Sequence, residues 1–219
     1  MHYQTTLIIP RLKHMFITFE GLDFCGKSTQ VQLLEKYFTS KGGNVKIIRE
    51  PGGTPISEKI RDILLDKKNS EMSIETELIL FSASRSQLVN EIILPGLRKG
   101  TIVISDRFHD SSIAYQGFGR KISLHFVEEL QSFVIGKAIP DITFFLDIPI
   151  KEVIARKSKV SKVDLDRIES SKMDFYKRVR DGYLYLADKE KRFCTIDGTL
   201  SIEEIHKIII NKVEELEKA

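Results

Sequence analysis

Along this chain of 219 residues, short runs of apolar, β-branched and aromatic residues alternate with longer stretches of helical pattern. There are five such runs, at Phe16–Phe19, Val45–Ile48, Thr101–Ser105, Ile142–Leu146 and Phe193–Ile196. Unbroken apolar runs are typical of strands that are buried on both faces, as in a parallel sheet covered by helices. Strands alternating with helices predict an α/β fold, here a doubly wound five-stranded parallel sheet flanked by helices.

The intervening segments predict helices. Ser201 and Glu204 form a capping-box pattern. Behind them, apolar residues recur on one face at helical spacing: Ile205, Ile208, Ile209, Val213 and Leu216. We expect Ile74–Lys99 to be a long helix with a break or kink near Pro95. Because no repeat or linker divides the chain, we expect an N-terminal extension outside the core at residues 1–14 and a single domain at residues 15–219.

The charge balance and the cysteines restrict the partners and the compartment. The formal net charge is +3, from 34 basic and 31 acidic residues, and no block of like charges forms a tail, so we expect no nucleic-acid partner. No apolar run reaches the roughly 18–20 residues that span a bilayer, so we expect no membrane partner. Cys25 and Cys194 fit neither a disulfide framework nor zinc-ligand spacing, which favours a reducing, cytoplasmic location.

A glycine-rich loop, Gly21–Ser28, follows the first predicted strand, matches G-x-x-x-x-G-K-[ST] and precedes a helical stretch that reaches about Tyr37. Glycines let the backbone turn tightly and aim its N–H groups at phosphate oxygens, which the helix N-terminus also attracts. The pattern predicts ATP or GTP binding, with Lys27 bridging the β- and γ-phosphates and the Ser28 hydroxyl reaching Mg²⁺. A chance Gly-Lys-Ser turn is the alternative. The expected nucleotide contacts in this segment are Gly21, Leu22, Asp23, Phe24, Cys25, Gly26, Lys27, Ser28 and Thr29.

The loop alone does not choose between a GTPase-type switch and a kinase for small molecules. Guanine recognition in GTPases resembles an N-K-x-D motif, whereas Asn211–Glu214 ends in glutamate and lies inside the last helical pattern. A solvated helix face explains this segment better, and we find no D-x-x-G switch motif after the third predicted strand. The sequence therefore favours a kinase.

A kinase needs an anion-selective pocket for its acceptor and a basic lid over the transferred phosphate. Four arginines follow predicted strands or lie on neighbouring segments: Arg49, Arg85, Arg107 and Arg120. The planar guanidinium suits phosphate and base-edge acceptors, although a surface or capping charge also explains each arginine alone. Residues 156–167 are basic and poor in apolar residues, which predicts a mobile lid at about 157–167, with a charged, solvated loop as the alternative.

Several motifs together resemble the thymidylate kinase family. They are Phe19–Asp23, Arg49–Thr54, Asp106–Phe108 with Ser111, Ala114–Gly117 and Leu165–Glu169, in order between about Met15 and the C-terminus. The resemblance implies a P-loop kinase fold and transfer of the ATP γ-phosphoryl group to dTMP, giving dTDP for dTTP biosynthesis. It also implies Mg²⁺ as cofactor, ATP and dTMP as partners, and a homodimer.

The resemblance further implies roles in the pocket for the nucleoside. Phe81 would stack on thymine, Arg85 would donate to its O4, and Gln116 would lie near the base. Tyr115 would crowd the 2′ position of the sugar, and Asp23 would bind the 3′-hydroxyl group. Stacking combined with a donor to O4 would select a pyrimidine carbonyl over the amino group of cytosine.

Around the phosphates, the resemblance implies that Arg49 and Arg107 hold the acceptor phosphate and that Ser112 completes the substrate-binding set. Ser28 and Asp106 would bind Mg²⁺. Because the acceptor oxygen is already a nucleophile, we expect catalysis by positioning and charge neutralisation rather than by a strong general base.

The expected catalytic residues are Lys27, Asp106, Arg107 and Arg167, and Arg156 would flank adenine. One subclass of the family places a catalytic arginine inside the glycine-rich loop, and another supplies it from the lid. Since this loop contains no arginine, we expect the lid to supply it through Arg167, with Lys159 and Lys162 as the alternatives.

Other acceptors remain possible on the sequence alone. The nearest alternative is another nucleoside monophosphate kinase, for dUMP, dCMP, AMP or GMP. A shikimate-type kinase is less favoured because its acceptor has no phosphate to engage Arg49 and Arg107, and a non-catalytic nucleotide-binding module is the least favoured. Thymine and uracil differ by one methyl group, which is worth only about 1–3 kcal/mol of selectivity.

Overall fold

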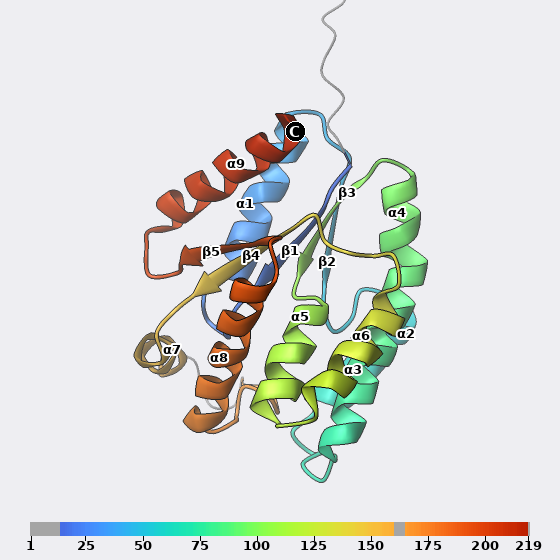
Figure 1. Cartoon of the computed structure of the whole chain (residues 1–219), viewed down its shortest axis with the longest axis vertical. Helices are drawn as coiled ribbons and strands as arrows, with labels where there is room; N and C mark the ends of the chain where they lie inside the picture. Colours follow the sequence, from blue (N-terminus) through green and yellow to red (C-terminus); the bar gives the residue numbers. More distant parts are fainter. Residues whose placement is uncertain (1–13, 160–164, 219) are drawn as a thin grey trace, which may run out of the picture.

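The computed structural model describes residues 14–159 and 165–218. Its strands are β1 (Phe16–Glu20), β2 (Val45–Arg49), β3 (Ile102–Asp106), β4 (Ile142–Asp147) and β5 (Phe193–Asp197). They pair in parallel in the order β2-β3-β1-β4-β5, with helices on both faces (Figure 1). The predicted doubly wound sheet is confirmed. Every strand ends one residue later than predicted, at a charged residue, because each predicted run stops at the last uncharged residue before it.

The connecting segments are helical, and two of them contain π-helical stretches. They are α1 (Lys27–Ser40), α2 (Pro55–Leu65), α3 (Ile74–Leu88), η1 (Val89–Ile93), α4 (Leu94–Arg98), α5 (His109–Ser112), η2 (Ile113–Gly119), α6 (Leu124–Ile135), α7 (Ile150–Lys157), α8 (Met173–Lys189) and α9 (Ile202–Lys218). Helices α1 and α9 pack together beside the sheet (Figure 1). Helix α8 packs on η2, and α3 packs on α6.

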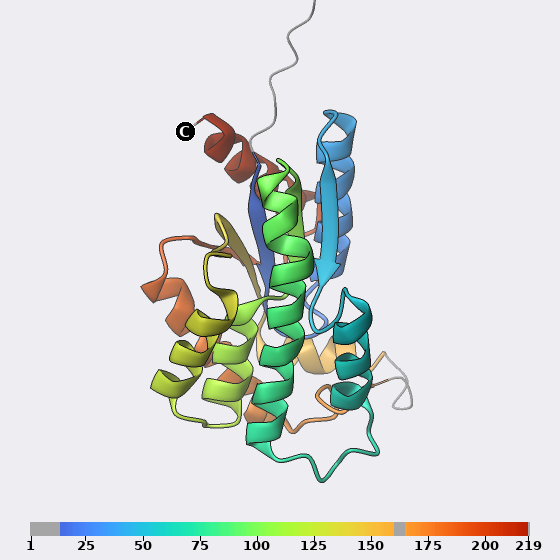
Figure 2. The ribbon, with the colours of Figure 1, turned by 90° about the vertical axis from the view of Figure 1, so that its right-hand side faces the viewer.

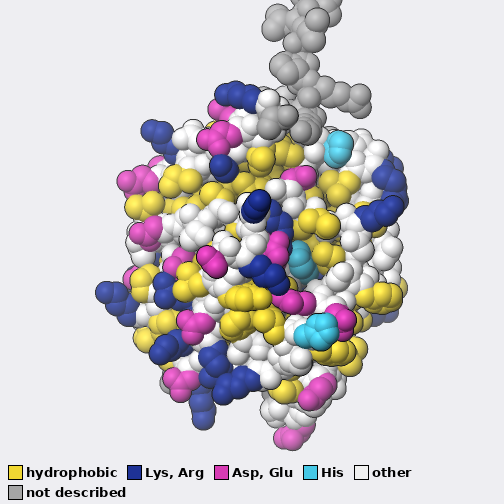
Figure 3. Space-filling view, viewed as in Figure 1, with side chains coloured by type: hydrophobic (Ala, Val, Ile, Leu, Met, Phe, Trp, Pro, Cys, Tyr) yellow, Lys and Arg dark blue, Asp and Glu magenta, His cyan; other side chains and the backbone are white. Residues whose placement is uncertain are grey.

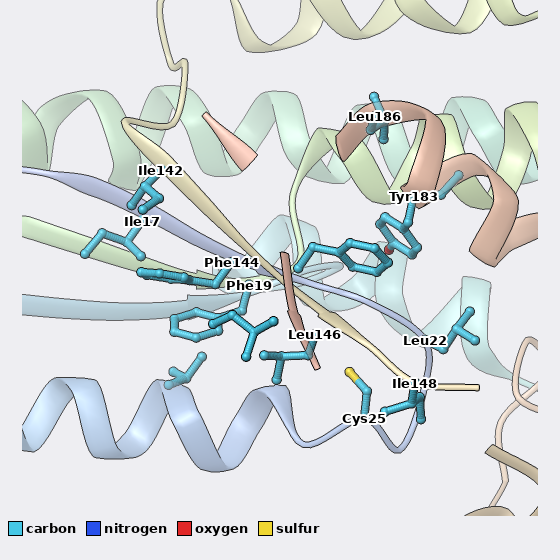
Figure 4. Packing of buried hydrophobic residues seen from close by; sticks show 14 of the residues in the cluster. Ile17, Phe19, Leu22, Cys25, Ile142, Phe144, Leu146, Ile148, Tyr183 and Leu186 are labelled. Carbon is cyan, nitrogen blue, oxygen red and sulfur yellow. The ribbon is translucent and has the colours of Figure 1, made fainter. Parts of the chain in front are cut away.

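Strand β1 lies at the centre of the sheet, between β3 and β4. All its residues are buried, including the polar Thr18 and Glu20, as expected for a strand that is enclosed on both faces. Figure 4 shows the packing on its two sides, with Phe19 and Leu146 facing α1 and Tyr183 of α8 on the opposite side. Phe19 pairs in register with Asp106 of β3, so the loops that follow β1 and β3 begin side by side.

The predicted long helix continues past Pro95 instead of breaking there. Helix α3 runs into the π-helical turn η1, and α4 follows with Pro95 in its first turn, as the continuous column in Figure 2 shows. Within this turn Leu94 donates its backbone N–H to the carbonyl of Val89. A proline lacks the N–H of an α-helical bond and its ring crowds the preceding turn, and the wider π turn accommodates both effects.

The predicted capping box is present at the start of α9. The Ser201 N–H donates to Glu204 Oε2 at 3.0 Å, and the Glu204 N–H donates to Ser201 Oγ at 3.2 Å. Three of the apolar residues predicted for the buried face are buried: Ile205, Ile209 and Val213. Ile208 is 38% exposed, because it lies at the edge of that face.

Within the described ranges, no helix has the length and hydropathy needed to cross a membrane. On the face drawn in Figure 3, acidic and basic side chains are interspersed. Residues 1–13 of the expected N-terminal extension, and Lys162 of the expected lid, lie outside the described residues.

Candidate active site

The ends of β2 and β3 and the loop after β1 contribute to a cavity of about 310 Å³. Ligands bind at this edge of a doubly wound sheet. Most of the residues predicted from the sequence line the cavity: Asp23, Phe24, Lys27, Ser28, Arg49, Phe81, Arg85, Asp106, Arg107, Ser112, Tyr115 and Gln116. Residues that are far apart in the chain thus share one site.

The glycine-rich loop has the backbone geometry that its sequence predicts. Gly21 has φ +140°, and a Cβ atom there would lie 2.6 Å from the carbonyl oxygen of Leu146, so the position requires glycine. Gly26, directly before α1, has φ +100°. Lys27 is 6% exposed, and its ammonium group donates to the carbonyl of Leu22 at 2.9 Å. The ammonium group therefore lies inside the curve of the loop.

Not every side chain of the loop faces the cavity. Leu22 and Cys25 are 1% exposed and belong to the hydrophobic core, and Figure 4 shows Cys25 close to Leu146. Only the backbone of these two residues is available to a ligand. Thr29 is exposed on the first turn of α1, and Phe81 of α3 lies half-buried in the cavity wall.

The hydroxyl of Ser28 donates to Asp106 Oδ2 at 2.6 Å. Ser28 lies on the first turn of α1 and Asp106 at the end of β3, so two separate elements bring these oxygens together. Mg²⁺ prefers oxygen ligands and is commonly held by one or two protein oxygens together with substrate phosphates and waters. The Ser28–Asp106 pair fits such a site.

Arg107 and Asp23, which both line the cavity, form an ion pair. Arg107 Nη2 lies 2.5 Å from Asp23 Oδ1 and donates to the Tyr115 hydroxyl at 3.1 Å. Arg107 has φ +70°, a conformation that is uncommon outside glycine and that occurs at functional sites. This backbone turn directs the guanidinium toward the loop, where Nη1 donates to the carbonyl of Gly21 at 3.0 Å.

Two tyrosine hydroxyls also contact Asp23. Tyr115 and Tyr176 each donate to Asp23 Oδ2 at 3.2 Å. Burial raises the pKa of the Asp23 carboxyl, but Arg107 and Lys27 outweigh burial, and the net pKa is lowered. Asp23 is therefore a carboxylate at neutral pH. Tyr176 was not predicted from the sequence, because it lies on α8, after the last motif, and no spacing in the sequence connects it with Asp23.

Arg85 reaches the cavity wall with its donors already paired. It is 1% exposed, its Nε donates to Glu50 Oε2 at 2.6 Å, and Nη1 donates to Ser112 Oγ at 2.8 Å and Gln131 Oε1 at 2.5 Å. Nη2 donates to the carbonyl of Phe108 at 3.0 Å. Burial raises the pKa of the Glu50 carboxyl, although Arg85 counteracts the rise.

Comparison with known proteins agrees with this geometry. A sequence model of the family described as thymidylate kinase matches residues 19–209. The chain belongs to the thymidylate kinase family. It is 47% identical to a thymidylate kinase of Kosmotoga olearia, over 90% of this chain and 94% of that protein. It is 49% identical to one of Thermosipho melanesiensis, over 87% and 93% respectively. The crystal structure of thymidylate kinase from Ehrlichia chaffeensis superimposes with a TM-score of 0.75 at 37% identity, covering 92% of this chain and 99% of that one.

In this thymidylate kinase family member, a further arginine lines the cavity beside Arg49. Arg49 is half-exposed and pairs with Glu58 at 3.1 Å. Arg61, on α2, donates to the carbonyl of Pro51 at 2.8 Å. Burial lowers the pKa of the Arg61 guanidinium, and the neighbouring charge of Arg49 lowers it further. Arg61 was not predicted, since the only signal in the sequence is its position on the same helical face as Glu58.

Gln116 and Arg167 both contact Glu77, which is 1% exposed at the start of α3. Gln116 Nε2 donates to Glu77 Oε1 at 2.9 Å, and Arg120 Nε donates to the same oxygen at 3.0 Å. Arg167 Nη2 lies 2.7 Å from Glu77 Oε2, as an ion pair without hydrogen-bond alignment. Arg167 Nε donates to the carbonyl of Leu64. The structure thus holds Arg167 beside the cavity, whereas Asp166, Ile168 and Glu169 line it.

Arg156 connects three segments at the opposite end of the loop. Its Nη1 donates to the carbonyl of Phe24 at 3.1 Å, and its Nη2 donates to the carbonyl of Gly198 at 3.1 Å. Glu152, one turn earlier on α7, accepts from its Nε at 2.7 Å. The guanidinium is therefore fixed between the glycine-rich loop and the turn after β5, and Arg156 does not line the cavity described above.

Proposed function

We propose that this protein transfers the γ-phosphoryl group of ATP to dTMP and releases ADP and dTDP. The observation that carries this proposal is that two interacting pairs line the same cavity. One is Ser28 with Asp106, and the other is Asp23 with Arg107. The first pair suits a nucleotide phosphate with its metal, and the second suits a phosphorylated sugar. Membership of the thymidylate kinase family supports the same reaction and favours it over the alternative acceptors.

At the donor end, the backbone of the glycine-rich loop and Lys27 bind the ATP phosphates, and Arg156 lies against adenine. The fixed position of Arg156 between Phe24 and Gly198 supports this role. Ser28 and Asp106 would hold Mg²⁺, which would supply positive charge against the phosphate oxygens. In this scheme the protein contributes position and positive charge rather than a general base.

At the acceptor end, Arg107 and Arg49 bind the phosphate of dTMP together with Arg61. The presence of all three guanidinium groups in the wall of the same cavity supports this role. Arginine presents several donors in one plane, which match the oxygens of a phosphate. Asp23, ionised through Arg107 and Lys27, accepts the hydrogen bond of the 3′-hydroxyl group. Both contacts orient the acceptor oxygen for in-line attack.

The nucleoside lies between Phe81 and the π-helical segment η2. Phe81 stacks on thymine, Tyr115 crowds the 2′ position, and Gln116, fixed by Glu77, lies near the base. Arg85 reaches O4 by exchanging one of its present acceptors, Ser112, for the base. The hydrogen bond between Arg85 and Ser112 supports a shared role for these two residues at the base edge.

Arg167 remains our prediction for the catalytic arginine of the lid. Its present ion pair with Glu77 means that it contacts the γ-phosphoryl group only after it leaves this carboxylate. The guanidinium would exchange one anionic partner, a carboxylate, for another, a phosphate. It would therefore be paired with an anion both before and after the movement. The alternatives for this role are Lys159 and Lys162.

Product analysis tests the proposed reaction. We expect the purified chain, incubated with Mg·ATP and dTMP, to form dTDP and ADP in equal amounts, as resolved by anion-exchange chromatography. Lys27→Ala should abolish both products while the protein remains folded by circular dichroism. Formation of ADP without dTDP, or a preference for another acceptor, would contradict the proposal.

We also propose a homodimer formed through α3 and α6. These helices pack against each other and expose large apolar side chains, with Ile79 57%, Phe126 50% and Phe133 86% exposed. Phe126 and Phe133 lie two turns apart on one face of α6. Sedimentation should show a dimer that Phe133→Asp dissociates, whereas Ile202→Asp on α9 should leave it intact. A monomeric wild type would contradict this assignment.

The protein is also proposed to act in the cytoplasm. Cys25 and Cys194 are both free in the described structure, which suits a reducing compartment.

A further inference from the structure

Glu20, the last residue of β1, has a fully buried carboxylate behind the wall of the cavity. Three groups donate to it. The Phe108 N–H donates to Oε1 at 2.7 Å, and the hydroxyls of Ser111 and Tyr183 donate to Oε2 at 2.6 Å and 2.7 Å. A carboxylate is only an acceptor, so this arrangement requires all three hydrogens to point toward Glu20.

The two hydroxyls connect Glu20 with Arg107. Arg107 Nη1 donates to Ser111 Oγ at 3.3 Å and to Tyr183 Oη at 3.1 Å, and these two oxygens lie 3.0 Å apart. A hydroxyl has one hydrogen and two lone pairs. When both hydrogens point to Glu20, both oxygens present lone pairs to Arg107. The carboxylate therefore sets the direction in which each hydroxyl can accept a hydrogen bond.

We propose that Glu20 and Tyr183 are positioning residues that orient Arg107 toward the acceptor phosphate. This inference rests on the proposed function, in which Arg107 binds that phosphate. Gly21, Ser111 and Tyr183 hold Nη1, while Nη2 contacts Asp23 and Tyr115. The contacts of both terminal nitrogens fix the plane of the guanidinium. Glu20 acts on this plane only through the two hydroxyls, because it does not itself contact Arg107 or the cavity.

The charges around Glu20 make its ionisation sensitive to pH near neutrality. Burial raises the pKa of the Glu20 carboxyl to about 7, and the negative charge of Asp110 on α5 raises it as well. Arg107 and the hydrogen bonds from Ser111 and Tyr183 act in the opposite direction. Arg192 lies behind Asp110 and pairs with it at 2.7 Å, so it also faces this group of charges.

Protonation of Glu20 changes its role in the network. A protonated carboxyl carries a hydrogen on one of its oxygens, so one of the three donors that converge on it loses its acceptor. The displaced hydroxyl then turns its hydrogen toward Arg107. Glu20→Gln reproduces this mismatch at every pH, because its amide N–H₂ must face either the two hydroxyls or the Phe108 N–H.

The substitutions can be made without removing much packing. Glu20→Gln preserves the shape of the side chain. Tyr183→Phe removes one hydroxyl and retains the ring, which stacks on Phe145 with a centroid separation of 5.2 Å. Tyr185→Phe is the matched control, because it removes a hydroxyl from the same helix at a side chain that packs on Phe118, away from Arg107.

Steady-state kinetics and calorimetry of dTMP binding test the inference. We expect Glu20→Gln and Tyr183→Phe each to raise the KM and the Kd for dTMP about tenfold or more, as for loss of hydrogen bonds to a charged group. The KM for ATP should stay within about twofold, and Tyr185→Phe should match the wild type. If the two effects act through one network, the double variant should be little worse than either single variant.

The pH dependence of the KM for dTMP separates a positioning role of Glu20 from a purely structural one, which would not change this dependence. The KM of the wild type for dTMP should rise as the pH falls below about 7, where Glu20 takes up a proton. That of Glu20→Gln should rise less, because only the dTMP phosphate, with a second pKa of about 6, still titrates there. An unchanged dTMP affinity in Glu20→Gln, or equal losses for ATP and dTMP, would overturn the inference. If Glu20→Gln does not fold, Tyr183→Phe and Ser111→Ala decide the outcome. A wild type that turns over another acceptor but not dTMP would refute the proposed function instead.

Discussion

Arg107 Nη2 lies 2.5 Å from Asp23 Oδ1, so the residue that follows β3 and the loop that follows β1 are joined by an ion pair at the cavity. The pair joins the two halves of the site, because the loop that carries Asp23 also carries Lys27, and Arg107 directly follows Asp106. The position proposed for ATP and the position proposed for dTMP are therefore linked through residues that are neighbours in the chain.

Arg107→Lys should lower kcat/KM for dTMP by about 100-fold or more, although it retains the positive charge. A lysine ammonium cannot contact Asp23, Tyr115, Tyr183 and the phosphate from one rigid plane. Arg178→Lys is the matched control, because Arg178 donates to the carbonyl of Gly119 and does not line the cavity. A kcat/KM within about threefold of the wild type for Arg107→Lys would rule out bidentate recognition by this residue.

Ser28→Ala and Asp106→Asn should each raise the Mg²⁺ concentration needed for half-maximal activity about tenfold or more, since each removes an oxygen from the predicted metal site. Chelation of Mg²⁺ should abolish turnover. Calorimetric binding of dTMP without Mg²⁺ should be nearly unchanged by Ser28→Ala. Ser40→Ala, at the far end of α1, should behave as the wild type, and an equal Mg²⁺ requirement in all the proteins would contradict the assignment.

Arg167→Ala should lower kcat about 100-fold or more, with a smaller effect on the KM for dTMP, if the lid arginine acts in the transition state. In the structure Glu77 pairs with this arginine, so the arginine must leave that carboxylate before it can contact the γ-phosphoryl group. Arg178→Ala removes a guanidinium outside the cavity and should leave kcat unchanged. A near-wild-type kcat for Arg167→Ala would transfer the role to Lys159 or Lys162.

The stability contributed by Glu20 should depend on pH in a direction opposite to that of most carboxyl groups. Its pKa is raised from 4.5 to about 7 in the folded protein, so folding favours the protonated form. This stabilisation is complete below pH 4.5 and is lost as the pH rises to about 7, by up to roughly 3 kcal/mol at 1.36 kcal/mol per pKa unit. Urea unfolding at several pH values should show this loss in the wild type relative to Glu20→Gln. Parallel stability curves for the two proteins would contradict it.

The fold was largely predictable because its signals are local. Unbroken apolar runs mark buried parallel strands, and the glycine-rich loop lies directly between β1 and α1, where its backbone conformations are needed. The course of the chain at Pro95 was less predictable. Proline indicates a disturbed helix but does not determine whether the chain breaks, kinks or widens into a π turn.

The candidate site was predictable where residues belong to short motifs, and much less so where partners are distant. Tyr176 and Tyr183 lie on α8, and no spacing within the sequence connects them with Asp23 or Glu20. The paired state of Arg85 also depends on residues from separate elements, Glu50 and Gln131 among them. Contacts of this kind come from packing between elements, and one sequence carries no local signal for them.

The most direct test of the central claim is a comparison of kcat/KM for dTMP, dUMP, dCMP, AMP, GMP and shikimate with Mg·ATP. We predict that dTMP exceeds every other acceptor, with dUMP next, because one methyl group separates thymine from uracil and is worth about 1–3 kcal/mol. Shikimate should give no turnover, because it has no phosphate for Arg49 and Arg107. A kcat/KM for AMP, GMP or dCMP equal to or above that for dTMP would contradict the account.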